Sequence, residues 1–207
     1  MILNFVSHFG AQLAAALVAG DIVASEHAGK TLKMILTRSL RRDQVLAGKT
    51  LASFTYVVAT IAVLGVAGLT AGPIAWGFQP LTNLSDVRLS AFHTLWLSAV
   101  SLGVFSLPLI TVAALAIMLS TVTRNGAASI VGTLVYAPGQ EAVAGLVHQS
   151  WAKHYLLSDQ FDGWHGVFMT PTDWTPIVRA AWVSAVFAAV PLAIAYVVFK
   201  RRDVADD

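Results

Sequence analysis

The sequence predicts an all-α integral membrane protein with five transmembrane helices. Its 207 residues are 57% hydrophobic and only 12% charged, and the mean hydropathy is +0.70. In soluble domains the charged share is about 25%. Stretches such as Val112–Met118 are apolar at every position, which favours membrane helices over the alternating pattern of a membrane β-strand. Composition therefore excludes a soluble globular domain.

A transmembrane helix needs about 20 mostly apolar residues. Five stretches meet this requirement, and no repeat or linker divides them, so we expect one transmembrane domain over residues 1–207. The predicted spans are 3–20, 50–72, 92–121, 126–147 and 177–199. Before the last span, the stretch 148–176 is rich in Trp, His and Asp, which predicts short interfacial helices and turns on the outer side.

The Lys and Arg residues are distributed unevenly between the connecting segments. Ten of the thirteen fall in 21–49, in 121–126 and in the tail after Phe199, whereas three fall in 73–91 and 148–179. Positive charge concentrates on the cytoplasmic side of membrane proteins. We therefore expect these three basic segments, the C-terminus included, to be cytoplasmic, which with five spans places Met1 outside.

The basic segment between the first two predicted spans has a helical pattern of its own. From Thr31 onward, Leu32, Ile35, Leu36 and Leu40 recur at helical spacing, with the cations mostly elsewhere. The pattern predicts a short amphipathic helix at the cytoplasmic surface, around 31–43. An ordinary basic loop attracted to anionic headgroups fits the composition too, since each such cation contributes about 1 kcal/mol.

Two stretches of sequence resemble the permeases of the type-2 ABC exporter family. The first is the run from Glu26 to Lys33 (EHAGKTLK), followed by Leu36-Thr37-Arg38-Ser39, Arg42 and Gly48-Lys49; the second is the ending Phe199-Lys200-Arg201-Arg202-Asp203. In the family, an acidic residue precedes Gly-Thr-Leu, a short leucine-rich helix follows, and Arg and Lys lead into the next span. Here Lys30 separates Gly29 from Thr31, so this register departs from the family by one residue.

The resemblance implies a permease subunit that works as a homodimer or heterodimer in the inner (plasma) membrane. It implies six spans with both termini cytoplasmic, so that 3–20 corresponds to the family's second span and the first span is absent. The basic segment would be the coupling helix that docks on a separate ABC ATPase subunit. The residues at matching positions are Glu26, Gly29, Thr31, Leu32, Leu36, Arg38, Arg42 and Lys49.

The sequence contains no Gly-x-x-x-x-Gly-Lys-Ser/Thr phosphate-binding loop. A transporter of this kind would therefore bind ATP and Mg²⁺ on its partner ATPase, and we expect no cofactor in this chain and no enzymatic activity of its own. The net charge of +2 is too small to indicate a nucleic-acid partner.

Ionisable and polar residues at membrane depth are candidates for a substrate pathway. His8 and Gln12 lie in the first predicted span, where they either line a pathway or bond between helices. Glu141 lies in the fourth, either at membrane depth or already in water if Pro138-Gly139 ends the helix.

A different class of function remains open, namely an intramembrane or outer-face enzyme. It would use Glu141 or the His and Asp residues of 148–173, which are His148, His154, Asp159, Asp162, His165 and Asp173. The irregular spacing of these residues favours solvated interfacial side chains over a metal site, and the absence of cysteine excludes thiolate ligands.

Overall fold

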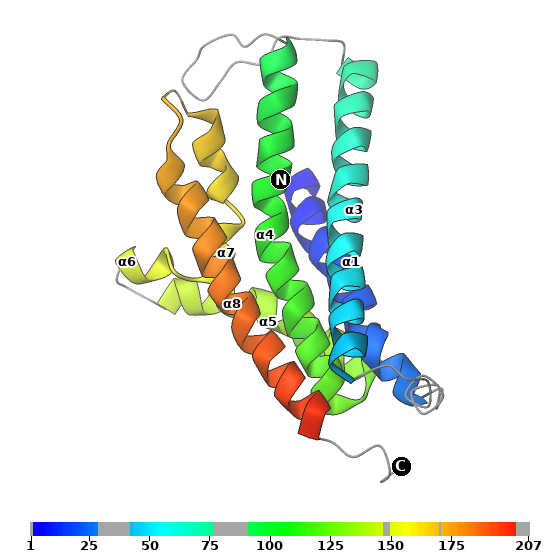
Figure 1. Ribbon diagram of the computed structural model, residues 1–207. Coiled ribbons are helices and arrows are strands. Elements are labelled where there is room, and N and C mark those ends of the chain that lie inside the picture. The colour runs from blue at the N-terminus through cyan, green and yellow to red at the C-terminus, as the bar shows by residue number, and fades with distance from the viewer. Residues whose placement is uncertain (1, 29–41, 77–90, 147–149, 170, 202–207) are drawn as a thin grey trace.

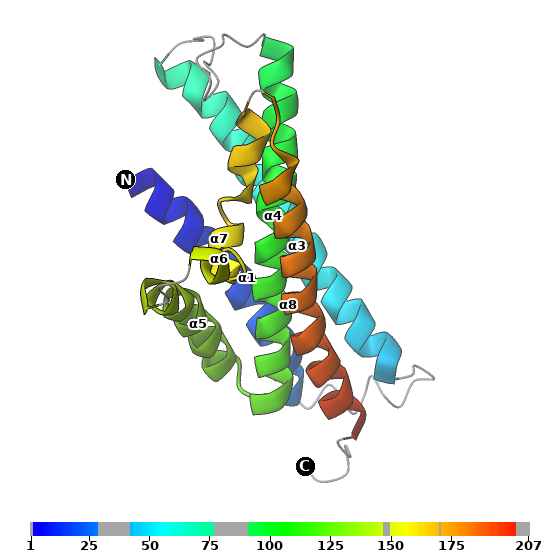
Figure 2. The ribbon, with the colours of Figure 1, turned by 90° about the vertical axis from the view of Figure 1, so that its left-hand side faces the viewer.

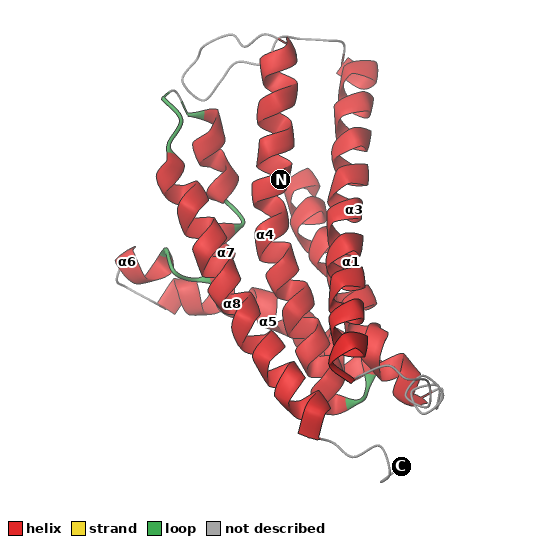
Figure 3. Ribbon diagram, in the orientation of Figure 1, coloured by secondary structure: helices red, strands yellow, loops and turns green. Residues whose placement is uncertain are grey.

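The computed structural model describes residues 2–28, 42–76, 91–146, 150–169 and 171–201, and every regular element within them is helical (Figures 1 and 3). The long helices are α1 (Ile2–Ala28), α3 (Arg42–Trp76), α4 (Ala91–Thr123), α5 (Gly126–Leu146) and α8 (Trp174–Arg201). Three short elements precede α8: α6 (Ser150–Lys153), α7 (Leu157–Gln160) and the 3₁₀ helix η1 (Gly163–Phe168). The predicted all-α class is confirmed.

Three of the described helices are long and apolar enough to cross a membrane, namely α3, α4 and α8. Their qualifying stretches correspond to the predicted spans 50–72, 92–121 and 177–199. The other two predicted spans form shorter apolar helices, Gly10–Ile22 within α1 and Gly126–Tyr136 within α5. The structure thus supports three of the five predicted spans.

Helix α4 is the centre of the bundle. It contacts α1, α3, α5 and α8, and these surround it in both perpendicular views (Figures 1 and 2). From α1 to α4 and on to α8, successive long helices run in alternating directions along the bundle (Figure 1). A helix apolar all round suits such a central position.

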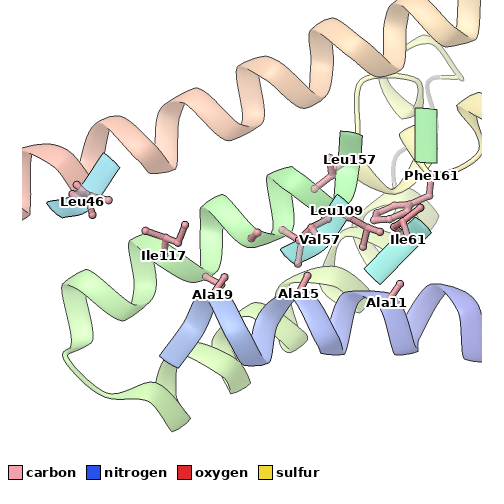
Figure 4. Close-up of a cluster of buried hydrophobic side chains, with 14 of the residues drawn as sticks. Ala11, Ala15, Ala19, Leu46, Val57, Ile61, Leu109, Ile117, Leu157 and Phe161 are labelled. Atoms are coloured by element: carbon pink, nitrogen blue, oxygen red, sulfur yellow. The ribbon is translucent and has the colours of Figure 1, made fainter. Parts of the chain in front are cut away.

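Small residues allow α1 to lie close against α4. Ala11, Ala15 and Ala19 follow one another at four-residue spacing, which places them on one face of α1, and all three are buried (Figure 4). Ala116 and Ile117 of α4 belong to the same core cluster and are fully buried. Close approach through small side chains is how membrane helices gain packing contacts where lipid competes with the protein core.

The short elements before α8 fold back along the bundle, with α6 and α7 near its mid-height (Figures 1 and 2). The predicted short helices are confirmed, but their packing was not expected. Phe161, directly after α7, is buried and meets Phe105 of α4 edge to face with ring centroids 5.6 Å apart. Leu157 joins the same core cluster. Much of this stretch is therefore part of the core.

Helix α8 begins at a capping carboxylate. Asp173 Oδ1 accepts a hydrogen bond of 2.9 Å from the backbone N–H of Thr175, which satisfies one of the unpaired amides of the first turn. This hydrogen bond holds the pKa of Asp173 below its ordinary value. The start of α8 lies three residues before the predicted span at 177.

Candidate coupling site at the basic end of the bundle

Several helix ends that carry cations meet at one end of the bundle. The end of α1, the start of α3, the α4–α5 turn and the end of α8 lie there together (Figures 1 and 2). The described parts of the three segments predicted to be cytoplasmic thus share one end. Which side of the membrane this end faces stays a prediction. The described cations in these parts are Arg42, Lys49, Arg124, Lys200 and Arg201.

Lys49 joins α3 to α1. Its side chain is buried, with 9% exposed, and Nζ donates a hydrogen bond to the backbone carbonyl of Ile22. A buried ammonium group is stable only where its hydrogen bonds are satisfied. Lys49 lies two turns inside α3, directly before the predicted span 50–72. There it holds the first part of that helix against the last part of α1.

Buried hydroxyl groups connect α1 and α5 to α4 at the same end. Ser120 Oγ of α4 accepts a hydrogen bond of 3.0 Å from the backbone N–H of Ala24. Ser129 Oγ of α5 donates one of 2.8 Å to the carbonyl of Ala116. Both serines are fully buried. Such bonds contribute about 0.6 kcal/mol each between membrane helices, so these contacts fix the relative positions of three helices.

The turn between α4 and α5 consists of Arg124 and Asn125. Arg124 has a positive φ of 55°, and its N–H bonds the carbonyl of Ser120 at 3.1 Å, which is how a left-handed residue closes a helix. Asn125 Oδ1 accepts a bond of 3.1 Å from the N–H of Ala128 and so caps α5. The tight turn predicted over 121–126 is confirmed.

Gly126 leaves room for Asp21. A Cβ atom at Gly126 would collide with the carboxylate of Asp21 in α1, so the glycine lets the first residue of α5 lie beside this side chain without displacing it. Sequence analysis did not select Asp21 as a site residue. Its place, as the first charged residue after an apolar stretch, was the signal that could have identified it.

Besides Lys49, the described coupling residues are Glu26 and Arg42, at the two flanks of the basic segment. Glu26 lies in the last turns of α1 and Arg42 is the first residue of α3, with only the backbone of each described. The intervening candidates lie outside the described residues: Gly29, Thr31, Leu32, Leu36 and Arg38. Of the predicted surface helix around 31–43, only residues 42–43 are described, and they belong to α3.

The three candidate pathway residues belong to neighbouring helices, α1 and α5. These helices are antiparallel, since Gly20 lies against Ile130 and the chain runs oppositely in the two (Figure 2). Residues before Gly20 are therefore level with residues after Ile130, which brings His8 and Gln12 toward the half of α5 that holds Glu141. Gln12 is partly buried, whereas only the backbone of the other two is described.

Helix α5 continues through Pro138 to Leu146, so the alternative in which the helix ends at Pro138-Gly139 is wrong. Directly before Glu141, the side chain of Gln140 donates a hydrogen bond from Nε2 to the hydroxyl of Tyr136, one turn earlier. Its Oε1 is buried without a hydrogen-bond partner among the described residues. Sequence analysis missed this polar pair.

The outer His and Asp residues form two separate local pairs. His154 Nδ1 lies 3.1 Å from Asp159 Oδ2, and His165 Nδ1 lies 2.8 Å from the carbonyl of Asp162. The described residues include no group of three His, Asp or Glu side chains placed to hold a metal ion, and His148 lies outside them. In this arrangement each of the two half-exposed imidazoles has an Asp residue beside it.

Comparison with known proteins shows the family of this chain. Residues 4–205 match the family described as "Protein of unknown function (DUF2705)". The chain is also similar to "Uncharacterized protein YhcI" of Bacillus subtilis (strain 168), with 24% identity over 211 residues, which cover 92% of this chain and 63% of that protein. The match thus spans less than two thirds of the relative's length. Since the family match covers almost the whole chain, the protein belongs to the DUF2705 family of proteins of unknown function.

Proposed function

We propose that this chain is the membrane subunit of an ATP-driven ABC exporter. In this proposal a separate ATPase subunit hydrolyses ATP and docks on the basic segment between Ala28 and Arg42. The observation that best supports it is the tether at the base of this segment, where Lys49 of α3 bonds the backbone of Ile22 in α1. The basic segment joins α1 to α3, and Lys49 links these two helices. A force on the segment would therefore act on both helices.

Transmission of motion follows from the contacts at this end. Displacement of the basic segment would act on the end of α1 and the start of α3 together, because Lys49 joins them. Helix α1 in turn bonds α4 through Ser120, and α4 bonds α5 through Ser129. Packed helices respond to such a push by shifting between discrete arrangements rather than by bending gradually. The nucleotide-driven closure of an ATPase dimer is the proposed source of the push.

The finer features of the proposal extend the resemblance noted in the sequence. They are five spans in this chain on a six-span family layout, the basic end in the cytoplasm of an inner membrane, and assembly as a dimer of permeases with two ATPases. His8, Gln12 and Glu141 are proposed to line the substrate pathway, because the antiparallel register brings their positions to one region between α1 and α5.

The test is co-purification of the chain, in detergent, with the ABC ATPase encoded beside it, together with the rate of ATP hydrolysis. The double reversal Arg38→Glu and Arg42→Glu is expected to weaken association at least about tenfold, since like charges facing each other cost several kcal/mol. Lys49→Gln is expected to leave association intact but to lower the permease-stimulated hydrolysis, because the buried tether transmits motion without touching the ATPase.

The matched control is Lys153→Glu, a charge reversal at an exposed position in α6, which should leave both readings unchanged. Association that survives the double reversal at the wild-type level would overturn the proposal, as would an ATPase that fails to bind the wild-type chain. Monodispersity on size-exclusion chromatography establishes that each variant is folded.

An outer-face enzyme is favoured by one observation, the His154–Asp159 contact of 3.1 Å between two half-exposed side chains. A carboxylate that orients an imidazole is a common arrangement for general-base catalysis. If the chain is an outer-face enzyme, Asp159→Asn is expected to abolish the phenotype that the chain confers on cells. If the chain is a transport subunit, the same substitution is expected to leave export and stimulated ATP hydrolysis unchanged.

A further inference from the structure

A groove runs between the first part of α3 and the last part of α8. The two helices pack on α4 and contact each other little, which leaves an open space of about 630 Å³ between them. This volume is within the range of small-molecule sites, about 300–1,000 Å³. Its walls are mostly apolar and include Leu46, Ala47, Leu51, Phe54, Leu192 and Tyr196.

Cations stand at the end of this groove that faces the basic end of the bundle. Leu192, Tyr196 and Lys200 follow each other at four-residue spacing on α8, so Lys200 continues the groove-lining face by one turn. Its Nζ lies 5.7 Å from the centre of the Tyr196 ring, and Arg201 follows. The described lining of the groove has one acidic side chain, Asp43, and the last turn of α8, directly beyond the lining residue Tyr196, carries the two cations Lys200 and Arg201.

We propose that this groove binds one anionic phospholipid from the bilayer. An acyl chain lies along the apolar wall, and the phosphate lies at Lys200 and Arg201. The charge pattern favours this occupant. The apolar groove ends beside a positively charged helix end, and a phospholipid combines an apolar chain with an anionic head. Basic pockets between membrane helices bind such heads. The proposal does not depend on the exporter function.

A bound lipid would act as a spacer between α3 and α8. Helix α3 is the least buried of the three long apolar helices, and its first part bears the buried Lys49 tether to α1. A chain that fills the groove adds contact to the side of α3 that α8 does not reach. Occupancy should therefore stabilise α3 in its described position, and detergent that strips lipid should loosen it.

The experiment places the purified full chain in nanodiscs of phosphatidylcholine with a small fraction of phosphatidylglycerol, followed by release into a mass spectrometer under native conditions. Wild-type protein is expected to retain one phosphatidylglycerol at saturation and to prefer it to phosphatidylcholine. Leu192→Trp fills the groove and should abolish retention. Lys200→Gln and Arg201→Gln should each reduce the preference for phosphatidylglycerol about fivefold, the effect of one cation near a lipid headgroup.

The matched control is Ile194→Trp, the same bulky substitution at an exposed position of α8 outside the groove lining, which should retain the lipid. Equal retention by the Leu192→Trp and Ile194→Trp variants would overturn the proposal, because it would show lipid bound around the helix rather than in the groove. Equal affinity for the two lipids would also overturn it. Cross-links from Leu51→Cys to a second copy of the chain would assign the groove to a protein interface instead.

Discussion

Helices α3 and α4 have nearly the same length, 35 and 33 residues, and both are long and apolar enough to cross a membrane. Their environments differ. In the most apolar stretch of α4, 50% of the residues are buried within the protein, against 11% in α3. Hydropathy places both helices in lipid, but it does not indicate which of them forms the centre of the fold.

The side chains of the two helices explain their different positions. The second half of α4 contains Ala113, Ala114 and Ala116, all fully buried, and these small residues let neighbouring backbones approach. Helix α3 carries large apolar residues that are exposed on its surface, among them Leu51, Val58, Val63, Leu64, Val66 and Leu69. Both helices contain many small residues; those of α4 are buried against neighbouring helices, and this placement accompanies its central position.

The largest expected effect comes from enlarging a small residue of α4. Ala116→Leu places extra methyl groups where α1 and α5 both pack, and overpacking of this kind costs about 1–3 kcal/mol. The matched variant is Ala62→Leu at an exposed position of α3, for which a change within about 0.5 kcal/mol is expected. Thermal unfolding of the detergent-solubilised protein measures both. Similar losses would show that α3 is packed as tightly as α4.

A smaller effect is expected from removing a hydrogen bond between α4 and α8. Thr111 Oγ1 donates to the carbonyl of Ser184 at 2.9 Å in a buried contact, so Thr111→Val should cost about 0.6 kcal/mol, the average for such bonds in membrane proteins. Thr55 of α3 bonds only the carbonyl of Leu51, one turn away in its own helix, among the bonds described. Thr55→Val should therefore be nearly neutral in the same unfolding assay, and a larger loss there would contradict the peripheral position of α3.

The smallest effect compares two glycines of α3. A Cβ at Gly65 would meet the end of the Leu102 side chain of α4, whereas a Cβ at Gly68 meets nothing. Gly68→Ala should raise stability by about 0.5 kcal/mol through its helix preference. Gly65→Ala should gain less, since Leu102 must move. Equal gains in melting temperature would show that α3 does not approach α4 at Gly65.

Sequence patterns predicted the helical class, the positions of α3, α4 and α8, and the short helices before α8. Three tertiary contacts were not predictable. The burial of Lys49 depends on a carbonyl of α1, 27 residues earlier in the chain. The approach of Gly126 to Asp21 and the contact of Phe161 with Phe105 equally join residues that no local pattern links.

By itself the sequence determined that the chain is helical and membrane-embedded, and which segments concentrate positive charge, because hydropathy and charge act on each segment separately. The tertiary structure decided that α4 is central, that Phe161 packs into the core, and that Lys49 ties α3 to α1. Core-facing and lipid-facing side chains are equally apolar. The choice between them therefore depends on how helices distant in the sequence fit together.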